Sequence, residues 1–296
     1  MTADPSYTGA LTEGRGGPTV FRIRLGAQLR RLREAQHITR EDAGYAIRSS
    51  DSKISRLELG RVGFKERDVG DLLTLYGVED ERERAVMLSL AGQANATGWW
   101  QEFAEVLPGW FEAYIGLEEA ATLIRAYEVQ FVPGLLQTRE YAHAVVRLGV
   151  PEVSDEEADR RVALRMHRQR LLSGPAAPRL WAVVDEAVLH RPLGGPAAMR
   201  AQLEHLIKAI ELPNVTLQVV PFARGGHAAA GGPFSLLRFA DPELPDIVFL
   251  EQLNSATYVD RSEDVDRYLE VIERLRLEAE PADATPGLLN AALARL

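Results

Sequence analysis

Apolar residues recur at helical spacing along the first third of the chain. Leu25, Leu29 and Leu32 predict an amphipathic helix with arginines on its outer side, and residues 39–61 predict two short helices joined by a tight turn. Two more helices are predicted by the apolar positions Val69, Leu72, Leu73 and Tyr76 and by Val86 and Leu90. Five helices in so short a stretch predict a compact all-α domain.

The pattern changes toward the C-terminus, where short apolar runs rich in β-branched residues predict strands. These runs are RLWAVV (179–184), VTLQVVPF (215–222), FSLLRF (234–239), IVFLEQ (247–252) and ATYVD (256–260). Helical spacing returns at Met199, Leu203, Leu206 and Ile210, and again from Ser262 to Ala279. The fold class predicted is an α N-terminal domain followed by a mixed α/β (α+β) C-terminal domain.

These patterns predict five segments along the chain. Residues 1–20 lack periodicity and are expected to be a disordered tail, and residues 21–95 form the helical domain. Residues 96–130 are interpreted as an aromatic-rich junction, and residues 131–285 as an α/β effector or dimerisation domain. Residues 286–296 are expected to be a C-terminal tail, with a short helix after Pro281.

Aromatic residues concentrate at the expected junction. Eight of the chain's 21 aromatic residues fall between Trp99 and Phe131, and such a density requires burial in core or interdomain packing, at a dimer face or in a ligand pocket. His227 lies in the glycine-rich segment RGGHAAAGGPF, a loop that suits the gating of a pocket better than catalysis. The candidates for ligand or partner contact are therefore Trp99, Trp100, Trp110, Phe111, Tyr114 and His227.

Charge and cysteine content narrow the possible functions. The chain has no cysteine, which excludes disulfides and thiolate metal sites. Its net charge is −9, yet residues 22–76 hold 12 Lys and Arg against 8 Asp and Glu, so this stretch carries +4 and the remainder −13. A basic segment on an acidic chain is typical of a nucleic-acid-binding domain. With no apolar run long enough to span a bilayer, we expect a cytoplasmic protein with no membrane partner.

The helix pair at residues 39–61 has the design of a helix-turn-helix unit. Thr39 and Ser50 are placed to cap the two helices, and Gly44 supplies the small residue needed where the helices cross. The second helix carries Ser52, Lys53 and Arg56 opposite the apolar Ile54 and Leu57. We therefore expect this helix to enter the major groove of double-stranded DNA; a structural or protein-binding helical unit is the alternative.

The same residues resemble a known family. LGAQLRRLRE (25–34), ITREDAGYAI (38–47) and SKISRLELGR (52–61) resemble the Cro/cI-type (XRE) helix-turn-helix regulators. Two positions depart from the family pattern: Gly44 replaces the usual alanine, and Arg48 replaces the usual turn glycine. We expect Arg48 to require a left-handed backbone.

The rest of the chain resembles the long C-terminal domain, of undefined function, of actinobacterial XRE regulators in the WhiJ-like group. The matching segments are GWW (98–100), LPGWFEAYIGLE (107–118), YEVQFVPGLLQTREYA (127–142), DEAVLHRPLGG (185–195) and GGPFSLLRF (231–239). The resemblance implies a regulator of development or secondary metabolism. It also implies a small acidic companion protein as a partner.

The resemblance and the chemistry of the side chains together assign expected roles. Arg40 is expected to meet a phosphate, while Ser52, Lys53 and Arg56 face base edges, Arg56 as a bidentate partner of guanine. Glu58 is expected to pair with an arginine inside the domain. The full set of DNA-binding candidates is Arg40, Arg48, Ser50, Asp51, Ser52, Lys53, Arg56 and Arg61, of which Arg48 and Arg61 are expected to hold the DNA backbone and Asp51 to accept from a cytosine amino group or assist the cap.

Signatures of catalysis are weak. Glu186 and His190 stand four residues apart, a spacing that suits two metal ligands on one helix face, but no third ligand is evident. The loop around His227 lacks the lysine and spacing of a phosphate-binding loop. We therefore expect no catalytic residue, no metal and no cofactor.

The sequence as a whole predicts a transcriptional regulator. It is expected to bind an inverted repeat as a homodimer, associated with the nucleoid when bound, and to receive a small-molecule effector or a protein signal through its C-terminal domain. Two alternatives remain: an antitoxin-like interaction scaffold for the small companion protein, and an enzyme with an autoregulatory helix-turn-helix.

Overall fold

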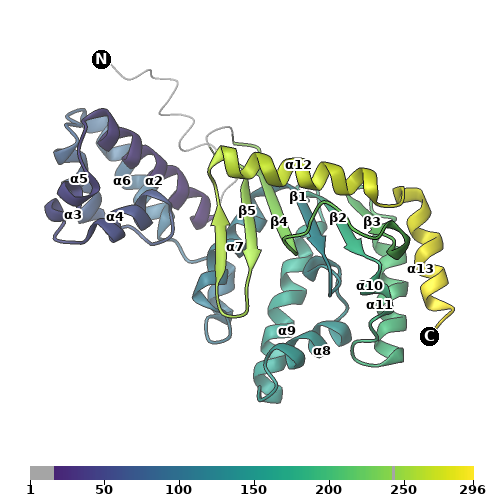
Figure 1. The fold of residues 1–296 in the computed structure, drawn as a ribbon. Coiled ribbons are helices and arrows are strands. Elements are labelled where there is room, and N and C mark those ends of the chain that lie inside the picture. Colours follow the sequence, from purple (N-terminus) through teal and green to yellow (C-terminus); the bar gives the residue numbers. More distant parts are fainter. Residues whose placement is uncertain (1–16, 242–243) are drawn as a thin grey trace. The chain divides into compact units, whose positions relative to one another are not determined.

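The structure is a computed structural model that describes residues 17–241 and 244–296 (Figure 1). Most of the tail predicted over residues 1–20 lies outside the described residues. Its last part is helical, because the first helix begins at Pro18, whose fixed φ suits the first position of a helix. Thr19 and Val20 follow and are buried, so the tail prediction was wrong for this turn.

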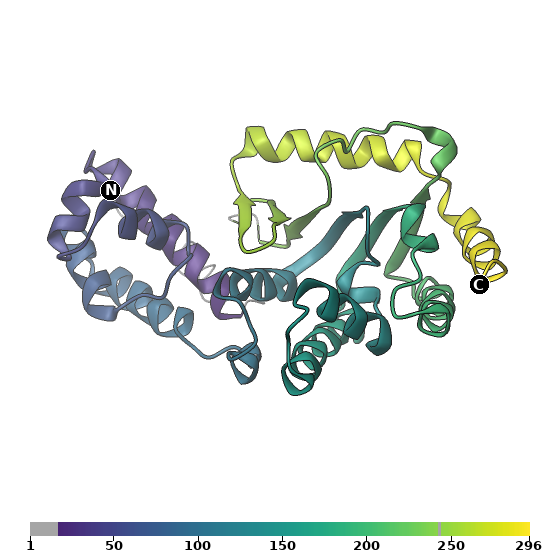
Figure 2. The same cartoon turned by 60° about the horizontal axis from the view of Figure 1, so that its bottom comes forward.

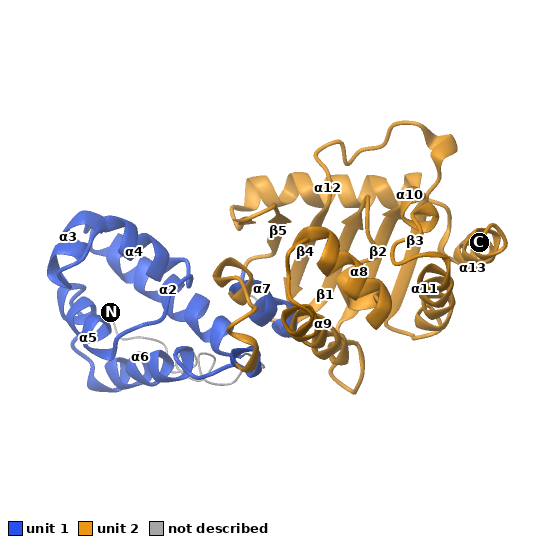
Figure 3. Ribbon diagram, turned by 90° about the horizontal axis from the view of Figure 1, so that it is seen from below, with its two compact units in different colours: residues 1–101, 113–120, 241–244 blue, residues 102–112, 121–240, 245–296 orange. Residues whose placement is uncertain are grey.

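The chain divides into two compact units (Figure 3). The first comprises residues 1–101, 113–120 and 241–244, and the second comprises residues 102–112, 121–240 and 245–296. No helix among the described residues is long and apolar enough to cross a membrane.

The first unit contains the five predicted helices. They are α2 (Pro18–Ala35), α3 (Arg40–Ala46), α4 (Asp51–Glu58), α5 (Glu66–Leu75) and α6 (Glu81–Ala94). Their apolar faces form one core, in which Leu25, Leu29, Ile54, Leu73 and Leu90 are almost completely buried. The helical spacing of the sequence therefore predicted both the elements and the inward faces.

The range 96–130 is more structured than the junction that was predicted. It contains the short helix η1 (Trp99–Phe103), the helix α7 (Gly109–Ala120) and the strand β1 (Ala121–Glu128). The strand was missed because it follows α7 without a break. Its polar residues Arg125 and Glu128 also interrupt the apolar run.

A six-stranded mixed sheet forms the centre of the second unit, with the strand order β3-β2-β1-β4-β5-β6. Besides β1, the strands are β2 (Arg179–Asp185), β3 (Val215–Val220), β4 (Phe234–Phe239), β5 (Ile247–Glu251) and β6 (Ala256–Val259), at the positions expected from the apolar runs. Strands β1, β2 and β3 are parallel, whereas β4, β5 and β6 join as antiparallel neighbours. The mixed α/β prediction for the C-terminal domain is confirmed.

The helices of this unit are placed by the handedness of its connections. They are α8 (Arg139–Gly149), α9 (Asp155–Gln169), α10 (Ala187–His190), α11 (Pro196–Ala209), α12 (Ser262–Glu278) and α13 (Thr285–Leu293), with the short helices η2 (Gly134–Leu136), η3 (Arg170–Leu172), η4 (Phe222–Arg224) and η5 (Ala282–Ala284). The chain adds β2 and then β3 on the same side of β1. Because both crossovers are right-handed, their helices lie on one face of the sheet. Figure 2 shows α8, α9 and α11 on that face and α12 across the other.

The core under α12 joins this helix to the sheet. Val265, Ile272 and Leu275 of α12 pack against Tyr127 of β1 and Val248 of β5. The C-terminal segment is also ordered, since α13 occupies most of the residues expected to be a tail and buries Leu289. The short helix predicted after Pro281 is confirmed.

Candidate DNA-binding surface

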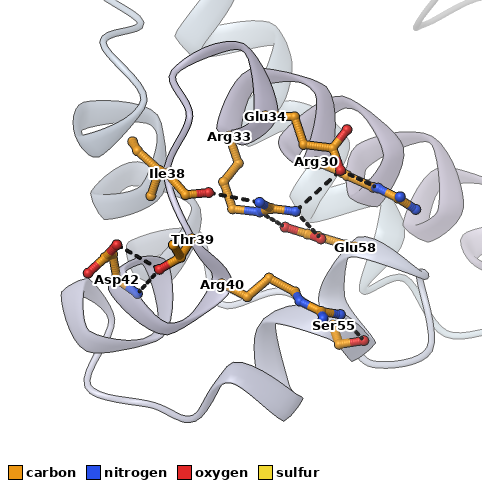
Figure 4. A network of polar contacts seen from close by, with 9 residues as sticks. All are labelled: Arg30, Arg33, Glu34, Ile38, Thr39, Arg40, Asp42, Ser55 and Glu58. Carbon is orange, nitrogen blue, oxygen red and sulfur yellow. Dashed lines mark hydrogen bonds and ion pairs between the residues drawn. The ribbon is translucent and has the colours of Figure 1, made fainter.

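The N-terminus of α3 is fixed by the predicted cap. Thr39 Oγ1 accepts a hydrogen bond from the Asp42 backbone N–H at 3.1 Å and donates one to Asp42 Oδ2 at 2.6 Å (Figure 4). Because Thr39 satisfies this end of the helix, α3 begins at Arg40, whose side chain is exposed. The Arg40 guanidinium reaches toward α4 and donates from Nη1 to Ser55 Oγ at 3.3 Å.

The turn between α3 and α4 brings the two helices close together. A Cβ atom added to Gly44 would lie 3.0 Å from the Ser49 carbonyl oxygen and 3.0 Å from the Ser50 carbonyl carbon, so only the smallest residues fit at this crossing. Arg48 has a φ of 53°, which confirms the predicted left-handed backbone. Its side chain is exposed beside a depression that is lined by Tyr45, Ala46, Arg48 and Ser49.

Helix α4 presents a polar outer face above an apolar inner one. Ser50 Oγ accepts from the Lys53 backbone N–H at 3.3 Å, which confirms the predicted cap. Ile54 and Leu57 are buried in the core of the unit, as the spacing predicted. Asp51, Ser52 and Arg56 are exposed, and Arg56 Nε makes a long hydrogen bond of 3.4 Å to the Ser52 carbonyl oxygen.

Lys53 differs from its neighbours on α4. Its ammonium Nζ lies 2.7 Å from Asp68 Oδ2 of α5, and its side chain is half-buried. The sequence predicted a residue facing base edges, whereas in the structure the ammonium pairs within the domain. Asp68 was not identified from the sequence, because the two residues are 15 positions apart on different helices.

A buried ion pair holds α2 against α4. Arg33 Nε donates to Glu58 Oε1 at 2.5 Å and Arg33 Nη2 to Glu58 Oε2 at 3.0 Å, a bidentate arrangement (Figure 4). Arg33 Nη1 also donates to the Ile38 carbonyl oxygen at 2.8 Å. The hydrogen bond to Glu58 raises the pKa of Arg33, which keeps the pair charged. The prediction that Glu58 pairs inside the domain is confirmed.

The loop after α4 adds further cations to this surface. Gly60 has a φ of 63°, and a Cβ atom there would lie 2.7 Å from the Ile23 backbone, so the loop passes directly over α2. Arg61 follows it and is exposed. Lys65, which precedes α5, is also exposed and was missed in the sequence because no periodic pattern marks a loop cation.

The aromatic candidates are divided between the two units. In the first unit Trp100 and Tyr114 are buried, and Trp99 meets Trp100 edge to face with ring centroids 5.9 Å apart. In the second unit the Phe111 ring lies beneath the Arg168 guanidinium at 4.9 Å, and Trp110 packs edge to face against Phe111. Burial is what plain packing requires, so a role of these residues in ligand or partner contact stays a prediction.

His227 packs against the sheet of the second unit. Its Nε2 lies 2.8 Å from the Tyr127 hydroxyl oxygen and 4.0 Å from Asp185 Oδ2. Its Nδ1 accepts from the Ala229 backbone N–H at 3.3 Å, so that Nε2 is the nitrogen that carries a proton in the neutral ring. These contacts fix the glycine-rich loop onto the end of β1.

The Glu186 and His190 pair is engaged within the second unit. Glu186 Oε1 lies 3.2 Å from His190 Nε2, and Glu186 Oε2 accepts from the Phe222 backbone N–H at 2.7 Å. Within residues 17–241 and 244–296 no three His, Cys, Asp or Glu side chains come together as a metal site would require. The spacing in the sequence therefore corresponds to a local side-chain contact, and Glu186 also holds the start of the segment after β3 through the Phe222 N–H.

Comparison with known proteins agrees with this arrangement. Residues 24–87 match the model of a helix-turn-helix domain, which indicates a DNA-binding regulator. Residues 111–291, more than half of the chain, match a domain of unknown function (DUF5753), and the chain therefore belongs to the DUF5753 family. No curated protein and no solved structure matches the chain.

Proposed function

We propose that this protein is a sequence-specific transcriptional regulator of the XRE type that binds an inverted repeat in DNA as a homodimer. It acts without catalysing a reaction, in the cytoplasm and on the nucleoid. The observation that carries this proposal is the outer face of α4. It is polar, exposed and capped by Ser50, while its inner residues belong to the core of a matched helix-turn-helix domain.

The charged side chains on and around α4 support two roles, base contact and phosphate contact. Arg56 is exposed in the last turn of the helix and can donate two hydrogen bonds to the O6 and N7 atoms of guanine. Arg40, Arg48 and Arg61, from α3, the turn and the loop after α4, are all exposed and are proposed to contact phosphates. Lys65 extends this set. Phosphate contacts fix the orientation of the helix, and the α4 side chains read the bases.

The second unit is proposed to receive a signal, either a small molecule or a partner such as a small acidic protein. It holds most of the family domain and its own core around a six-stranded sheet. A signal acts on DNA binding by binding one arrangement of the dimer more tightly than another. The same unit is the proposed site of dimerisation.

The proposal is tested by selecting genomic fragments with the purified full chain and titrating the best fragment by fluorescence anisotropy at several salt concentrations. We expect a palindromic site with half-sites about 10 base pairs, or a multiple of that, apart. Logarithmic affinity should fall linearly with logarithmic salt concentration because binding releases counterions. Retention of no fragment, or affinity that does not depend on salt, contradicts the proposal.

Dimerisation is measured separately by sedimentation of the free chain and of its complex with the selected fragment. Two chains per palindrome are expected. One chain per fragment would retain DNA binding but contradict the dimeric mechanism.

A further inference from the structure

Two glutamates end strands at the same edge of the sheet in the second unit. Glu128 is the last residue of β1 and Glu251 the last residue of β5. Because β4 is antiparallel to both strands, β1 and β5 run in the same direction. Ser235 of β4 pairs with Ala126 on one side and with Phe249 on the other. Two residues further on, Glu128 and Glu251 share the next row, with Cα atoms about 10 Å apart.

Both glutamates project from the face of the sheet that carries α9. Their strand neighbours Tyr127 and Leu250 contribute to the core under α12, and successive strand residues point to opposite faces. On this face Arg165 of α9 interacts electrostatically with both carboxylates. Two acidic groups and a guanidinium, from three different elements, thus converge at one place.

The two carboxylates are not satisfied by the protein. Within the described part of the chain neither the Glu128 nor the Glu251 side chain forms a hydrogen bond or an ion pair. Arg165 does not close on them, because its Nη1 donates to Gln137 Oε1 at 2.7 Å. Gln137 is itself buried and fixed, with Nε2 donating to the Val132 carbonyl oxygen at 2.6 Å. The remaining donors of Arg165 are therefore held near the carboxylates without being bound to them.

Solvent reaches this place. Glu251 and Pro233, the residue that lies between the two glutamates in the same row, are exposed, and Glu128 is half-buried. Ser235 is partly exposed although it lies in a strand with neighbours on both sides. The next row of the same face consists of Ala126 and Ser235 beside Phe249, whose ring packs against Phe111 with centroids 6.0 Å apart.

The pKa values of Glu128 and Arg165 agree with charges that lack a partner of opposite sign at close range. Burial, together with the neighbouring Glu251 carboxylate, raises the pKa of Glu128 to about 8. Burial lowers the pKa of Arg165 to about 10, with Arg168 contributing in the same direction. A bound cation would favour both carboxylates, since charged groups deprived of water are stabilised by a partner of opposite charge.

We propose that this place is a binding site for a small zwitterionic molecule, whose primary ammonium group lies between Glu128 and Glu251 and whose acidic group is bound by Arg165. Two carboxylates that share a row suit one ammonium, which has three donors to distribute between them. The guanidinium of Arg165 suits a carboxylate or a phosphate. An ammonium ion alone adds no acidic partner for Arg165, and an anion alone adds no cation for the two glutamates, so the intact zwitterion binds best.

The proposed site gives the signal-receiving unit a binding place and a ligand class. Only the regulatory effect of the ligand rests on the proposed function. Binding is measured on the full chain without DNA. Loss of the site would leave the DNA-binding proposal intact, and loss of DNA binding would leave the site intact.

The test uses 4-aminobutyrate and 6-aminohexanoate as zwitterionic probes, with butylammonium and hexanoate as controls that carry one charge each. Isothermal titration calorimetry and thermal melting are recorded with each probe at up to about 20 mM, a range in which a millimolar ligand raises the melting temperature measurably. We expect at least one zwitterion to bind about tenfold more tightly than either control, the equivalent of about 1.4 kcal/mol.

The variants are Glu128→Gln and Glu251→Gln, which keep the shape of each side chain, and Arg165→Gln. Glu204→Gln, at an exposed position of α11, is the matched control. Each site variant should lower zwitterion affinity about tenfold or more while the control binds as the wild type does, in line with the loss of one charge-assisted hydrogen bond. Melting of every variant without probe shows whether it is folded.

Three outcomes overturn the inference. They are no response to any of the four probes, equal binding of butylammonium and the zwitterions, and a zwitterion response that folded Glu128→Gln and Glu251→Gln proteins retain. If Arg165→Gln fails to fold, the comparison of butylammonium with the zwitterions still tests the role of Arg165.

Discussion

Lys53 of α4 and Asp68 of α5 form an ion pair in which Nζ and Oδ2 are 2.7 Å apart. The helix proposed to read DNA thus holds one of its cations against the next helix of the domain. This pair fixes the Lys53 side chain and places a negative charge beside the surface proposed to meet DNA.

Replacing Asp68 with Asn should release Lys53 and remove this negative charge. We expect non-specific DNA affinity to rise and the salt slope to steepen by about one unit, because one more cation meets phosphate. Stability should fall by no more than about 1 kcal/mol, the usual scale for a partly exposed pair. Anisotropy titrations against random DNA measure the slope. Asp71→Asn, in the exposed Arg67 pair of the same helix, is the control, and an equal response of both variants would contradict the assignment.

Arg56→Ala should lower affinity for the selected site by about 1–3 kcal/mol and leave affinity for random DNA nearly unchanged, because a base contact is lost. The melting temperature should stay that of the wild type, since the side chain is exposed. Arg82→Ala, at an exposed position of α6, is the matched control for lost charge. Retained preference for the selected site would remove Arg56 from base reading.

Arg40→Ala should act differently from Arg56→Ala. A phosphate contact contributes to every sequence, so specific and non-specific affinities should fall together and the salt slope should flatten by about one unit. Titrations of the selected site and of random DNA at matched salt concentrations measure both effects. A loss restricted to the selected site would assign Arg40 to base reading instead.

Glu58→Ala should unfold or strongly destabilise the first unit. It leaves the buried Arg33 guanidinium without its bidentate partner, and breaking a buried pair costs about 3–5 kcal/mol. Chemical denaturation followed by circular dichroism measures the loss. Glu34→Ala, which removes an exposed carboxylate beside the same arginine, should cost less than about 1 kcal/mol. Similar losses of unfolding free energy in both variants would show that the buried Glu58 pair stabilises the unit no more than the exposed Glu34 contact does.

The raised pKa of Glu128 predicts a pH-dependent stability of the second unit. The folded protein keeps a proton on Glu128 up to about pH 8, while the unfolded chain loses it near the ordinary value of 4.5. This contribution is fully present below pH 4.5 and is lost as the pH rises through about 8. Burial raises the pKa of Glu128 most, the Glu251 carboxylate of β5 raises it further, and Arg165 of α9 acts in the opposite direction.

Glu128→Gln should remove this dependence, because the amide does not titrate. Denaturation at pH 5, 7 and 9 is expected to show a wild type that loses stability relative to the variant as the pH rises. Parallel curves for the two proteins would contradict the raised pKa. The Glu204→Gln control should follow the wild type.

Local interactions explain what the sequence predicted well. Thr39 and Ser50 cap helices that start one residue later, and each accepts a bond from a backbone N–H three residues ahead. Ile54 and Leu57 face the core because helical spacing puts them on one side. The left-handed backbone of Arg48 follows from a turn that must close within a few residues.

Strand β1 shows where such reasoning stops. The segment ATLIRAYE follows α7 directly, and it becomes a strand by pairing with β2, more than 50 residues later, and with β4, more than 100 residues later. Sequence spacing does not report pairing at such distances. Pairing with β2 and β4 places the segment at the centre of the sheet in the second unit.

The sequence by itself determined the helix-turn-helix unit, its caps and its inward faces, because neighbours within a few positions fix all of these. The tertiary structure decided that Lys53 pairs with Asp68 and that Glu128, Glu251 and Arg165 converge on one face of the sheet. These charges meet across elements far apart in the chain. Their energies depend on burial and on distances that only the packed fold sets.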